Sequence, residues 1–361
     1  MLSRHESSTA EALRVISTAD SGARVAAFKF LSCFRTCKRS PTIAADNSKW
    51  HSPTLKVLFV KTSSLGDVVH NCPAVSDVAR KHPGVEIDWV VEEPFAAIPS
   101  MHPAVRRVIP VRLRRWRGAW WRSATWREIG DFRKRIAAER YDAVIDTQSL
   151  IKSAVISVCA DGDRHGMDAA SARESLAANF YDYRYAVPRG EHAVQRNRRL
   201  TAAALGYALD LPLDYGLQRA SDAGNEAPYA VFLTMTSRAD KLWSEDRWIE
   251  LGGKLNLRTL LPWGSDDERS RATRIASALP GAEVMPRMTL EQLARLFGRA
   301  QAVVGVDTGL THLAAASGVR TVGIYCGSDP ALTGIYGAPN ATNVGALGAA
   351  PPVDQVLQAL R

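Results

Sequence analysis

The sequence Val303-Val304-Gly305-Val306-Asp307-Thr308-Gly309-Leu310-Thr311-His312 decides the fold. Residues 301–306 are apolar and rich in β-branched side chains, which is typical of a parallel strand covered on both faces. An acid, a hydroxyl and a glycine follow, and a helix is expected from 310 to 316. Because the first N–H groups of a helix have no acceptor within it, this stretch predicts an anion site at the end of a buried strand.

Strands and helices alternate around this stretch through the second half of the chain. We expect strands at 230–233, 259–261, 283–285, 301–306 and 321–325, with helices at 246–257, 266–278, 290–300, 311–317 and 353–360. Such alternation predicts a parallel sheet with helices on both faces.

The first half of the chain has the same pattern. Strands are expected at 55–61, 86–91, 107–111 and 142–146, and helices at 66–80, 126–138, 150–160 and 191–208. Residues 161–189 are polar and aromatic without a strong period, and no element is predicted there. A linker is expected at 221–228, where Ser, Asp, Gly, Asn and Pro accumulate.

These patterns predict two α/β domains. We place the first domain at 54–220, a second domain at 221–345 and a closing helix in 346–361. Residues 1–53 carry only a short apolar patch, at 25–34, which Lys29 interrupts. We therefore expect a disordered extension or a misplaced start codon there rather than a secretory signal.

The charge of the chain favours an acidic partner. The net charge is +9 and the sequence pI is about 9.5, which suits nucleic acid, an anionic membrane surface or a phosphorylated substrate. Residues 106–140 alone hold twelve basic residues against three acids. The five cysteines are scattered without a CxxC pair, which predicts reduced thiols in a cytoplasmic protein. No apolar run reaches the roughly 18 residues of a membrane span.

Asp67 follows the first strand in the sequence Lys61-Thr62-Ser63-Ser64-Leu65-Gly66-Asp67. A carboxylate there can take the proton of an attacking hydroxyl as a general base. It can equally cap its helix, where an acid near the N-terminus contributes roughly 0.3–1 kcal/mol. Ser63 and Ser64 have a similar pair of interpretations, since they can hydrogen-bond a sugar or diphosphate, or their own backbone.

Other polar residues follow strands of the second half, at the edge where open α/β sheets bind ligands. Lys241, with Thr236 and Ser237, can stabilise a diphosphate leaving group, although most lysines are simply solvated. Glu268 can accept the hydroxyls of a ribose or can complement its helix dipole. Met288 as a side chain is core filler.

No DxD-type pair that would bind a metal appears at a strand end. Positive potential for a leaving group is available from Lys241 and from the helix terminus after Asp307. We expect no metal requirement, and we expect His312 to be a core or sugar-contacting residue rather than a metal ligand.

Arginine and tryptophan alternate in a segment from Arg112 to Arg127. Guanidinium groups suit carboxylates and phosphates, and the tryptophans suit a lipid headgroup interface. The same pattern describes single-strand nucleic-acid binding, but no RNA-binding module is recognisable, and no nucleic-acid partner is expected.

Three motifs in this order and spacing resemble the ADP-heptose:lipopolysaccharide heptosyltransferases over nearly all of the chain after about residue 54. They are Lys61 to Asp67, Leu261-Pro262-Trp263-Gly264 and Val306 to His312. Arg114-Arg115-Trp116-Arg117 and Tyr141 to Asp146 add to the resemblance. The resemblance implies the GT-B fold, with two Rossmann-like domains facing across a cleft.

The resemblance also implies roles for individual residues. Asp67 is then the base, Lys241 assists the leaving group, and His312 faces the donor pocket. The expected donor-binding residues are Thr236, Ser237, Lys241, Glu268, Met288 through its backbone, Asp307, Thr308, Gly309, Leu310 and His312. The expected acceptor-binding residues are Ser63, Ser64, Arg112, Arg114, Arg115 and Arg117.

The implied activity is inverting transfer of L-glycero-D-manno-heptose from ADP-heptose to the first Kdo of Kdo2-lipid A. No cofactor is expected, and the protein is expected on the cytoplasmic face of the inner membrane as a peripheral protein. A sibling enzyme acting on the second heptose is a rival interpretation, against which the basic segment argues because Kdo is more acidic. The residues also leave open a sugar-nucleotide epimerase and a non-catalytic basic binding protein.

Overall fold

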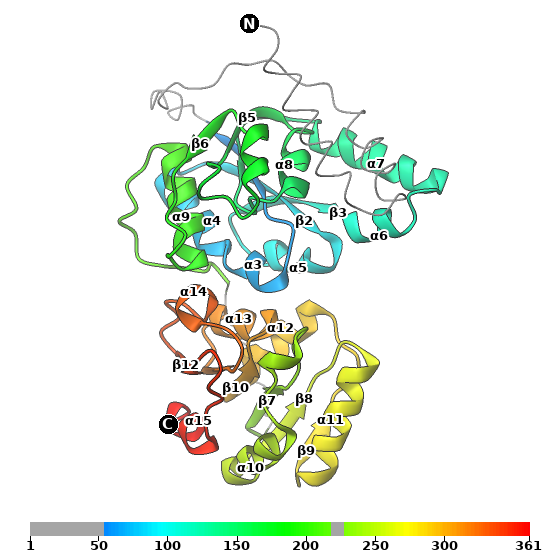
Figure 1. The fold of residues 1–361 in the computed structure, drawn as a ribbon, viewed down its shortest axis with the longest axis vertical. Coiled ribbons are helices and arrows are strands. Elements are labelled where there is room, and N and C mark those ends of the chain that lie inside the picture. Colours follow the sequence, from blue (N-terminus) through cyan, green and yellow to red (C-terminus); the bar gives the residue numbers. More distant parts are fainter. Residues whose placement is uncertain (1–53, 218–226) are drawn as a thin grey trace, which may run out of the picture.

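The computed structural model describes residues 54–217 and 227–361, called here the N-terminal and C-terminal halves (Figure 1). The extension expected at 1–53 and most of the linker expected at 221–228 lie outside these ranges. Each half contains one parallel six-stranded sheet. The predicted α/β class with two such sheets is therefore confirmed.

The N-terminal sheet has the strand order β3-β2-β1-β4-β5-β6, and all its pairings are parallel. Its strands are β1 (Lys56–Val60), β2 (Glu86–Glu92), β3 (Val105–Val111), β4 (Arg140–Asp146), β5 (Asp161–Met167) and β6 (Tyr183–Tyr185). The helices of this half are α3 (Leu65–Val69), α4 (Cys72–Lys81), α5 (Ala97–Ser100), α6 (Leu113–Gly118), α7 (Ser123–Ile136), α8 (Ile151–Ser157) and α9 (Ala193–Leu205), with 3₁₀ helices at Glu93–Phe95 and Ser175–Phe180.

The C-terminal sheet has the order β12-β11-β10-β7-β8-β9 and is also parallel. Its strands are β7 (Tyr229–Leu233), β8 (Arg258–Leu261), β9 (Ala282–Val284), β10 (Ala302–Val306), β11 (Thr321–Tyr325) and β12 (Ala341–Gly345). Its helices are α10 (Glu245–Leu255), α11 (Asp266–Ala278), α12 (Leu290–Arg299), α13 (Gly309–Ala316), α14 (Pro330–Thr333) and α15 (Val353–Ala359), with a 3₁₀ turn at Ala239–Lys241. Every residue of β7, β10 and β11 is buried, as their apolar runs predict.

Two sequence expectations about elements were wrong. The single helix expected from Gly66 to about Arg80 is two helices, α3 and α4, separated at His70 and Asn71. Pro73 explains the break, because proline has no N–H to continue a helix from α3. Strands β5, β6 and β12 were not predicted, because β5 and β12 contain few apolar residues and show no alternation, and β6 is only three residues long.

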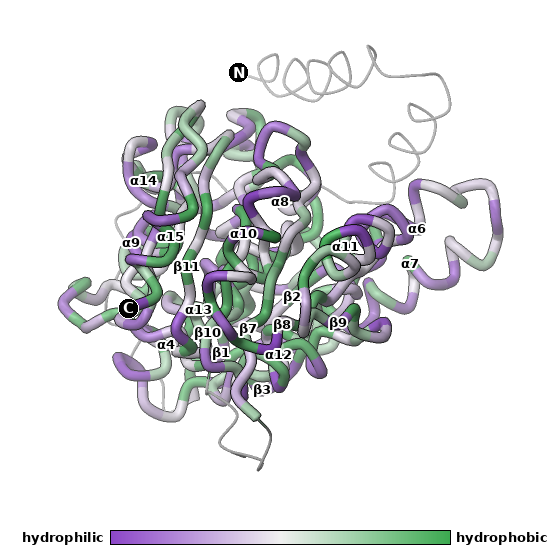
Figure 2. Tube along the Cα trace, turned by 90° about the horizontal axis from the view of Figure 1, so that it is seen from below, coloured by the Kyte–Doolittle hydropathy of each residue, from purple (hydrophilic) through white to green (hydrophobic). Residues whose placement is uncertain are grey.

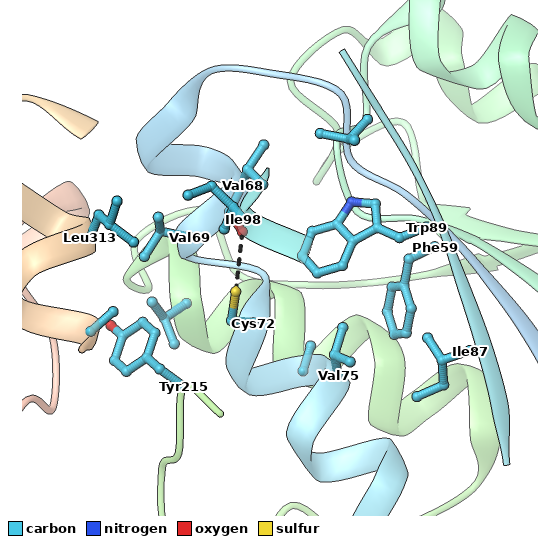
Figure 3. Packing of buried hydrophobic residues seen from close by; sticks show 14 of the residues in the cluster. Phe59, Val68, Val69, Cys72, Val75, Ile87, Trp89, Ile98, Tyr215 and Leu313 are labelled. Atoms are coloured by element: carbon cyan, nitrogen blue, oxygen red, sulfur yellow. Dashed lines mark hydrogen bonds between the residues drawn. The ribbon is translucent and has the colours of Figure 1, made fainter. Parts of the chain in front are cut away.

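The two halves meet at α3 and α13 (Figure 1). Gly309 of α13 lies so close to α3 that a Cβ atom there would be 2.5 Å from Cβ of Leu65, so only glycine fits. Leu313 of α13 lies beside Val69 of α3 in one apolar cluster (Figure 3). Apolar residues concentrate in the central strands, while the turns around α6 are hydrophilic (Figure 2). Among the described residues no helix has the length and apolar content that a membrane span requires.

Candidate functional site

A cavity of about 280 Å³ lies beside Asp67, and both halves contribute to its wall. From the C-terminal half come Leu332 and Thr333 of α14. The N-terminal half supplies Lys61, Asp67, Thr147, Gln148, Ser149, Met167, Arg173, Arg189, Glu191, Ala193, Arg196 and Asn197. Four cationic side chains against two acids give this cavity a positive potential.

The placement of Asp67 suits both of the roles that the sequence left open, the helix cap and the general base. Its Oδ2 atom accepts from the backbone N–H of Ser64 at 2.9 Å and from the Ser64 hydroxyl at 3.2 Å, so it caps α3. Its side chain is also 25% exposed at the cavity, and Nη1 of Arg173 lies 3.4 Å from Oδ2. Burial alone would raise the pKa of Asp67, but Lys61, Arg173 and the bonds from Ser64 lower it below its ordinary value. The carboxylate is therefore ionised and able to accept a proton.

Lys61 follows β1 and is buried in the wall of the cavity. Its Nζ donates to the carbonyl of Thr147 at 2.8 Å and to Oδ1 of Asn197 at 3.4 Å. Burial lowers the pKa of Lys61 to about 8, with the charge of Asp67 acting against that decrease. The ammonium group thus stays within the cavity wall without a direct carboxylate partner among the described residues.

A buried carboxylate shapes the loop that follows β4. Asp146 ends β4, and its Oδ1 accepts from the backbone N–H groups of Gln148 and Ser149 at 2.8 and 3.1 Å. The hydroxyl of Tyr181 donates to Oδ2 at 2.8 Å. Gln148 then accepts from the backbone of Thr62 and Ser63 through Oε1. Two successive loops are in this way held around the cavity.

The two serines predicted to contact the acceptor differ in exposure. Ser63 is buried, and its Oγ accepts from Nζ of Lys152 at 2.9 Å. Ser64 is exposed and donates to Asp67. Burial lowers the pKa of Lys152. The negative charge of Glu92 opposes this decrease, and the positive charges of Arg114 and Arg173 add to it.

Asp307 lies at the end of β10 as the opening stretch predicts, and it is held by three side chains. Its Oδ2 accepts from Nζ of Lys241 at 2.6 Å and from Oγ of Ser328 at 2.5 Å. Nε2 of His312 lies 3.5 Å from Oδ1. Burial would raise the pKa of Asp307, but these three partners hold it well below its ordinary value.

The other residues predicted around the leaving group are at the same edge of the C-terminal sheet. Oγ1 of Thr236 donates to the carbonyl of Asp307 at 2.9 Å, and Ser237 is exposed. Thr308 is the N-cap residue of α13, so the helix begins directly after β10. The half-buried residues 308–310 thus present the start of α13 near Lys241.

Glu268 and Met288 lie in the segments that follow β8 and β9. Oε2 of Glu268 accepts from the backbone N–H of Gly264 at 2.6 Å, in the first turn of α11. Met288 is half-buried and packs against the main apolar cluster. Trp263 donates to the carbonyl of Met285 at 2.6 Å, which joins these two loops.

The arginines of α6 lie outside the cavity wall. Arg112 pairs with Glu93, and Arg115 pairs with Glu128 at 2.5 Å. Arg114 stacks over the ring of Phe95 at 5.6 Å, and Arg117 is exposed. The structure therefore does not bring the predicted acceptor-binding arginines into the wall of the cavity that contains Asp67.

Sequence reasoning missed most of the cationic residues around Asp67. Arg173 and Arg189 come from the stretch in which no element was predicted, and Arg196 lies on α9. Lys61 stands in a quoted motif but had no assigned role. Within residues 54–217 and 227–361, no group of three or more His, Cys, Asp and Glu side chains is placed to hold a metal ion.

The chain is similar to known glycosyltransferases. The model of glycosyltransferase family 9 (heptosyltransferase) matches residues 129–358. The chain is 47% identical to lipopolysaccharide heptosyltransferase 1 of Escherichia coli K12 over 294 residues, which are 78% of this chain and 91% of that protein.

Two solved structures from E. coli are also similar. The structure of heptosyltransferase WaaC with ADP-2-deoxy-2-fluoro heptose matches with a TM-score of 0.77 at 44% identity, over 84% of this chain and 98% of that one. ADP-heptose lps heptosyltransferase II matches with a TM-score of 0.68 at 21% identity, over 85% and 97% of the two chains, which shows the fold alone.

Proposed function

The chain belongs to glycosyltransferase family 9, the heptosyltransferases, and on that premise we propose that it transfers heptose from ADP-heptose to the first Kdo of Kdo2-lipid A. The 47% identity to lipopolysaccharide heptosyltransferase 1 supports the acceptor, and the similar structure with an ADP-heptose analogue supports the donor. In this proposal residues 54–220 form the acceptor domain and residues 221–345 the donor domain.

One observation supports this proposal most directly: Asp67 lies in a cationic cavity whose wall includes residues of both halves. The acceptor hydroxyl attacks the anomeric carbon while Asp67 takes its proton, and the bond from that carbon to the ADP oxygen breaks. A single displacement of this kind inverts the configuration at the anomeric carbon.

The departing ADP gains negative charge as the bond breaks. Lys241, the hydroxyls of Thr236 and Ser237, and the backbone N–H groups of residues 308–310 stabilise that charge. Asp307 and His312 contact the heptose, while Glu268 and the backbone of Met288 hold the nucleoside. Because these groups supply the positive potential, the proposed transfer uses no metal ion or cofactor.

The charges of the cavity support an acidic acceptor. Lys61, Arg173, Arg189 and Arg196 surround the space next to Asp67 and complement sugar carboxylates. The first heptose, which is the acceptor of the sibling enzyme, is neutral by comparison and would make less use of these cations. The geometry therefore favours transfer to Kdo over transfer to the first heptose.

The surface formed by α6 and the start of α7 is proposed to contact lipid headgroups on the cytoplasmic face of the inner membrane. Trp121 is 64% exposed there, and the arginines at 114, 115, 117, 122 and 127 are exposed around it. Tryptophan and arginine together suit the interface between water and anionic lipid.

A transfer assay tests the proposal. Labelled ADP-heptose is incubated with Kdo2-lipid A, with lipid A lacking Kdo, with the already heptosylated acceptor, or alone. We expect labelled lipid only with Kdo2-lipid A. Transfer restricted to the heptosylated acceptor would establish the sibling activity, and conversion of ADP-heptose to an epimer without an acceptor would contradict the transferase reaction.

A further inference from the structure

Three buried histidine rings lie together where the two halves meet. His70 and His192 belong to the N-terminal half, and His312 belongs to α13. The ring centroids of His70 and His312 are 4.6 Å apart, and those of His70 and His192 are 5.3 Å apart. The proposed reaction assigns a role only to His312, which leaves His70 buried between the halves without one.

His312 connects His70 to the donor side of the site. Its Nε2 lies 3.5 Å from Oδ1 of Asp307, and its Nδ1 lies 3.4 Å from Nε2 of His70. An ionised carboxylate only accepts, so His312 faces Asp307 with its Nε2–H. In the tautomer with its one hydrogen atom on Nε2, His312 accepts at Nδ1 from Nε2–H of His70. The three residues form one chain of polar contacts between the halves.

His70 is equally well fixed on the acceptor side. It ends α3, where its backbone N–H donates to the carbonyl of Gly66 at 2.9 Å. Its own carbonyl accepts from Nδ2 of Asn197 at 3.1 Å. Asp67 belongs to the same short helix, so any displacement of His70 displaces the predicted base.

The fit of His312 against α3 is close as well. A Cβ atom built on Gly66 would lie 3.1 Å from Cδ2 of His312, so the imidazole packs directly against the residue that precedes Asp67. His192 adds a second link, because its Nε2 lies 3.0 Å from the carbonyl of Gly334 and its ring stacks on Tyr336 at 4.4 Å. The halves are thus joined by polar contacts beside the predicted base.

We propose that His70 is a positioning residue for the transfer: through His312 it fixes α3, and with it Asp67, relative to Asp307 in the donor-binding half. The inference rests on the proposed function, because it assigns Asp67 and Asp307 to acceptor and donor. His70 itself touches neither substrate. Its loss therefore lowers the rate of the chemical step and leaves donor binding unchanged.

The test is the kinetics of His70→Phe, which keeps a ring and removes both nitrogens. We expect kcat to fall about tenfold or more, the effect of one lost buried hydrogen bond in the transition state, with the Kd of ADP unchanged. His70→Gln should restore most of the rate, because its amide N–H can donate to His312. Wild-type kcat in His70→Phe, or no recovery in His70→Gln, would overturn the proposal.

A matched control is His102→Phe. His102 is buried, and its ring nitrogens bond to Ser76 at 3.0 Å and to the backbone N–H of Ala104 at 3.2 Å, both in the N-terminal half. We expect this variant to lose thermal stability and keep wild-type kcat. A loss of kcat equal to that of His70→Phe would show that His70 has only a structural role, and would contradict the proposal.

If His70→Phe does not fold, His70→Gln is compared with the shorter His70→Asn. Equal kcat in those two would contradict it. Inactive wild-type enzyme would instead contradict the proposed function.

Discussion

Nζ of Lys241 lies 2.6 Å from Oδ2 of Asp307, so the cation predicted to serve the leaving group is already held by the carboxylate predicted to bind the sugar. The pair orients Lys241 before the donor arrives, because one of its three N–H donors is fixed by Asp307. The remaining two are available for the phosphate oxygens of ADP. The same contact joins the 3₁₀ turn that follows β7 to the end of β10.

Lys241→Met tests this arrangement. The variant removes the charge that stabilises the departing ADP, so we expect kcat to fall by about a hundredfold or more, the usual range for one such group. The measurement is steady-state transfer to Kdo2-lipid A. Lys254→Met is the matched control, since Lys254 is an exposed lysine of the same half that pairs with Glu250 and Asp354. Comparable losses in both variants would contradict the role of Lys241.

The buried Lys61 predicts a specific dependence of stability on pH. Its folded pKa of about 8 is below its unfolded value of 10.5, so the unfolded chain binds more protons between these two values. The contribution of Lys61 to the free energy of unfolding therefore rises as the pH increases from about 8 to 10.5. The total rise is about 3 kcal/mol, since one pKa unit corresponds to 1.36 kcal/mol. Lys61→Met should lack this rise in thermal melts across that window. The same slope in both proteins would contradict the assignment.

Much of this architecture was predictable from the sequence because its central strands are apolar runs. Residues 301–306 and 321–325 could be assigned directly, and α11 has the predicted bounds. β5 has the sequence Asp-Gly-Asp-Arg-His-Gly-Met, which contains one apolar residue and no alternation. That strand forms because it pairs with β4 on one side and with β6 on the other. Such pairing is a tertiary interaction, which the local sequence pattern does not indicate.

The site was predictable only in part, for a related reason. The acid and hydroxyl residues at strand ends could be found from their motifs; Asp67 lines the cavity and Asp307 directly follows β10. Arg173 and Arg189 were missed because they reach the cavity from irregular segments. The contact of His70 with His312 joins residues that are 242 positions apart, so no spacing in the sequence indicates it.

Chelation tests the expected absence of a metal requirement. Lys241 and the start of α13 provide the positive potential in this proposal, so excess EDTA should leave the transfer rate unchanged. The rate is compared before EDTA, after EDTA and after Mg²⁺ is restored. A loss on chelation that Mg²⁺ reverses would show that the protein cations are insufficient.

Trp121 tests the proposed membrane surface. Trp121→Ser removes an exposed aromatic ring from the surface formed by α6 and the start of α7, so binding to vesicles containing anionic lipid should weaken several-fold. Co-sedimentation with the vesicles measures it. Leu347→Ser is the control, because Leu347 is 67% exposed in the C-terminal half. Equal binding by Trp121→Ser and wild type would exclude this surface.

The central claim is that Asp67 is the base, and the kcat of Asp67→Asn tests it most directly. The asparagine oxygen can still accept from the backbone N–H of Ser64, so the cap of α3 is kept while the proton acceptor is lost. We predict that Asp67→Asn and Asp67→Ala both lose at least about a hundredfold in kcat, with the Kd of ADP unchanged. Wild-type kcat in Asp67→Asn, with a loss only in Asp67→Ala, would show that the carboxylate serves the helix and not the reaction.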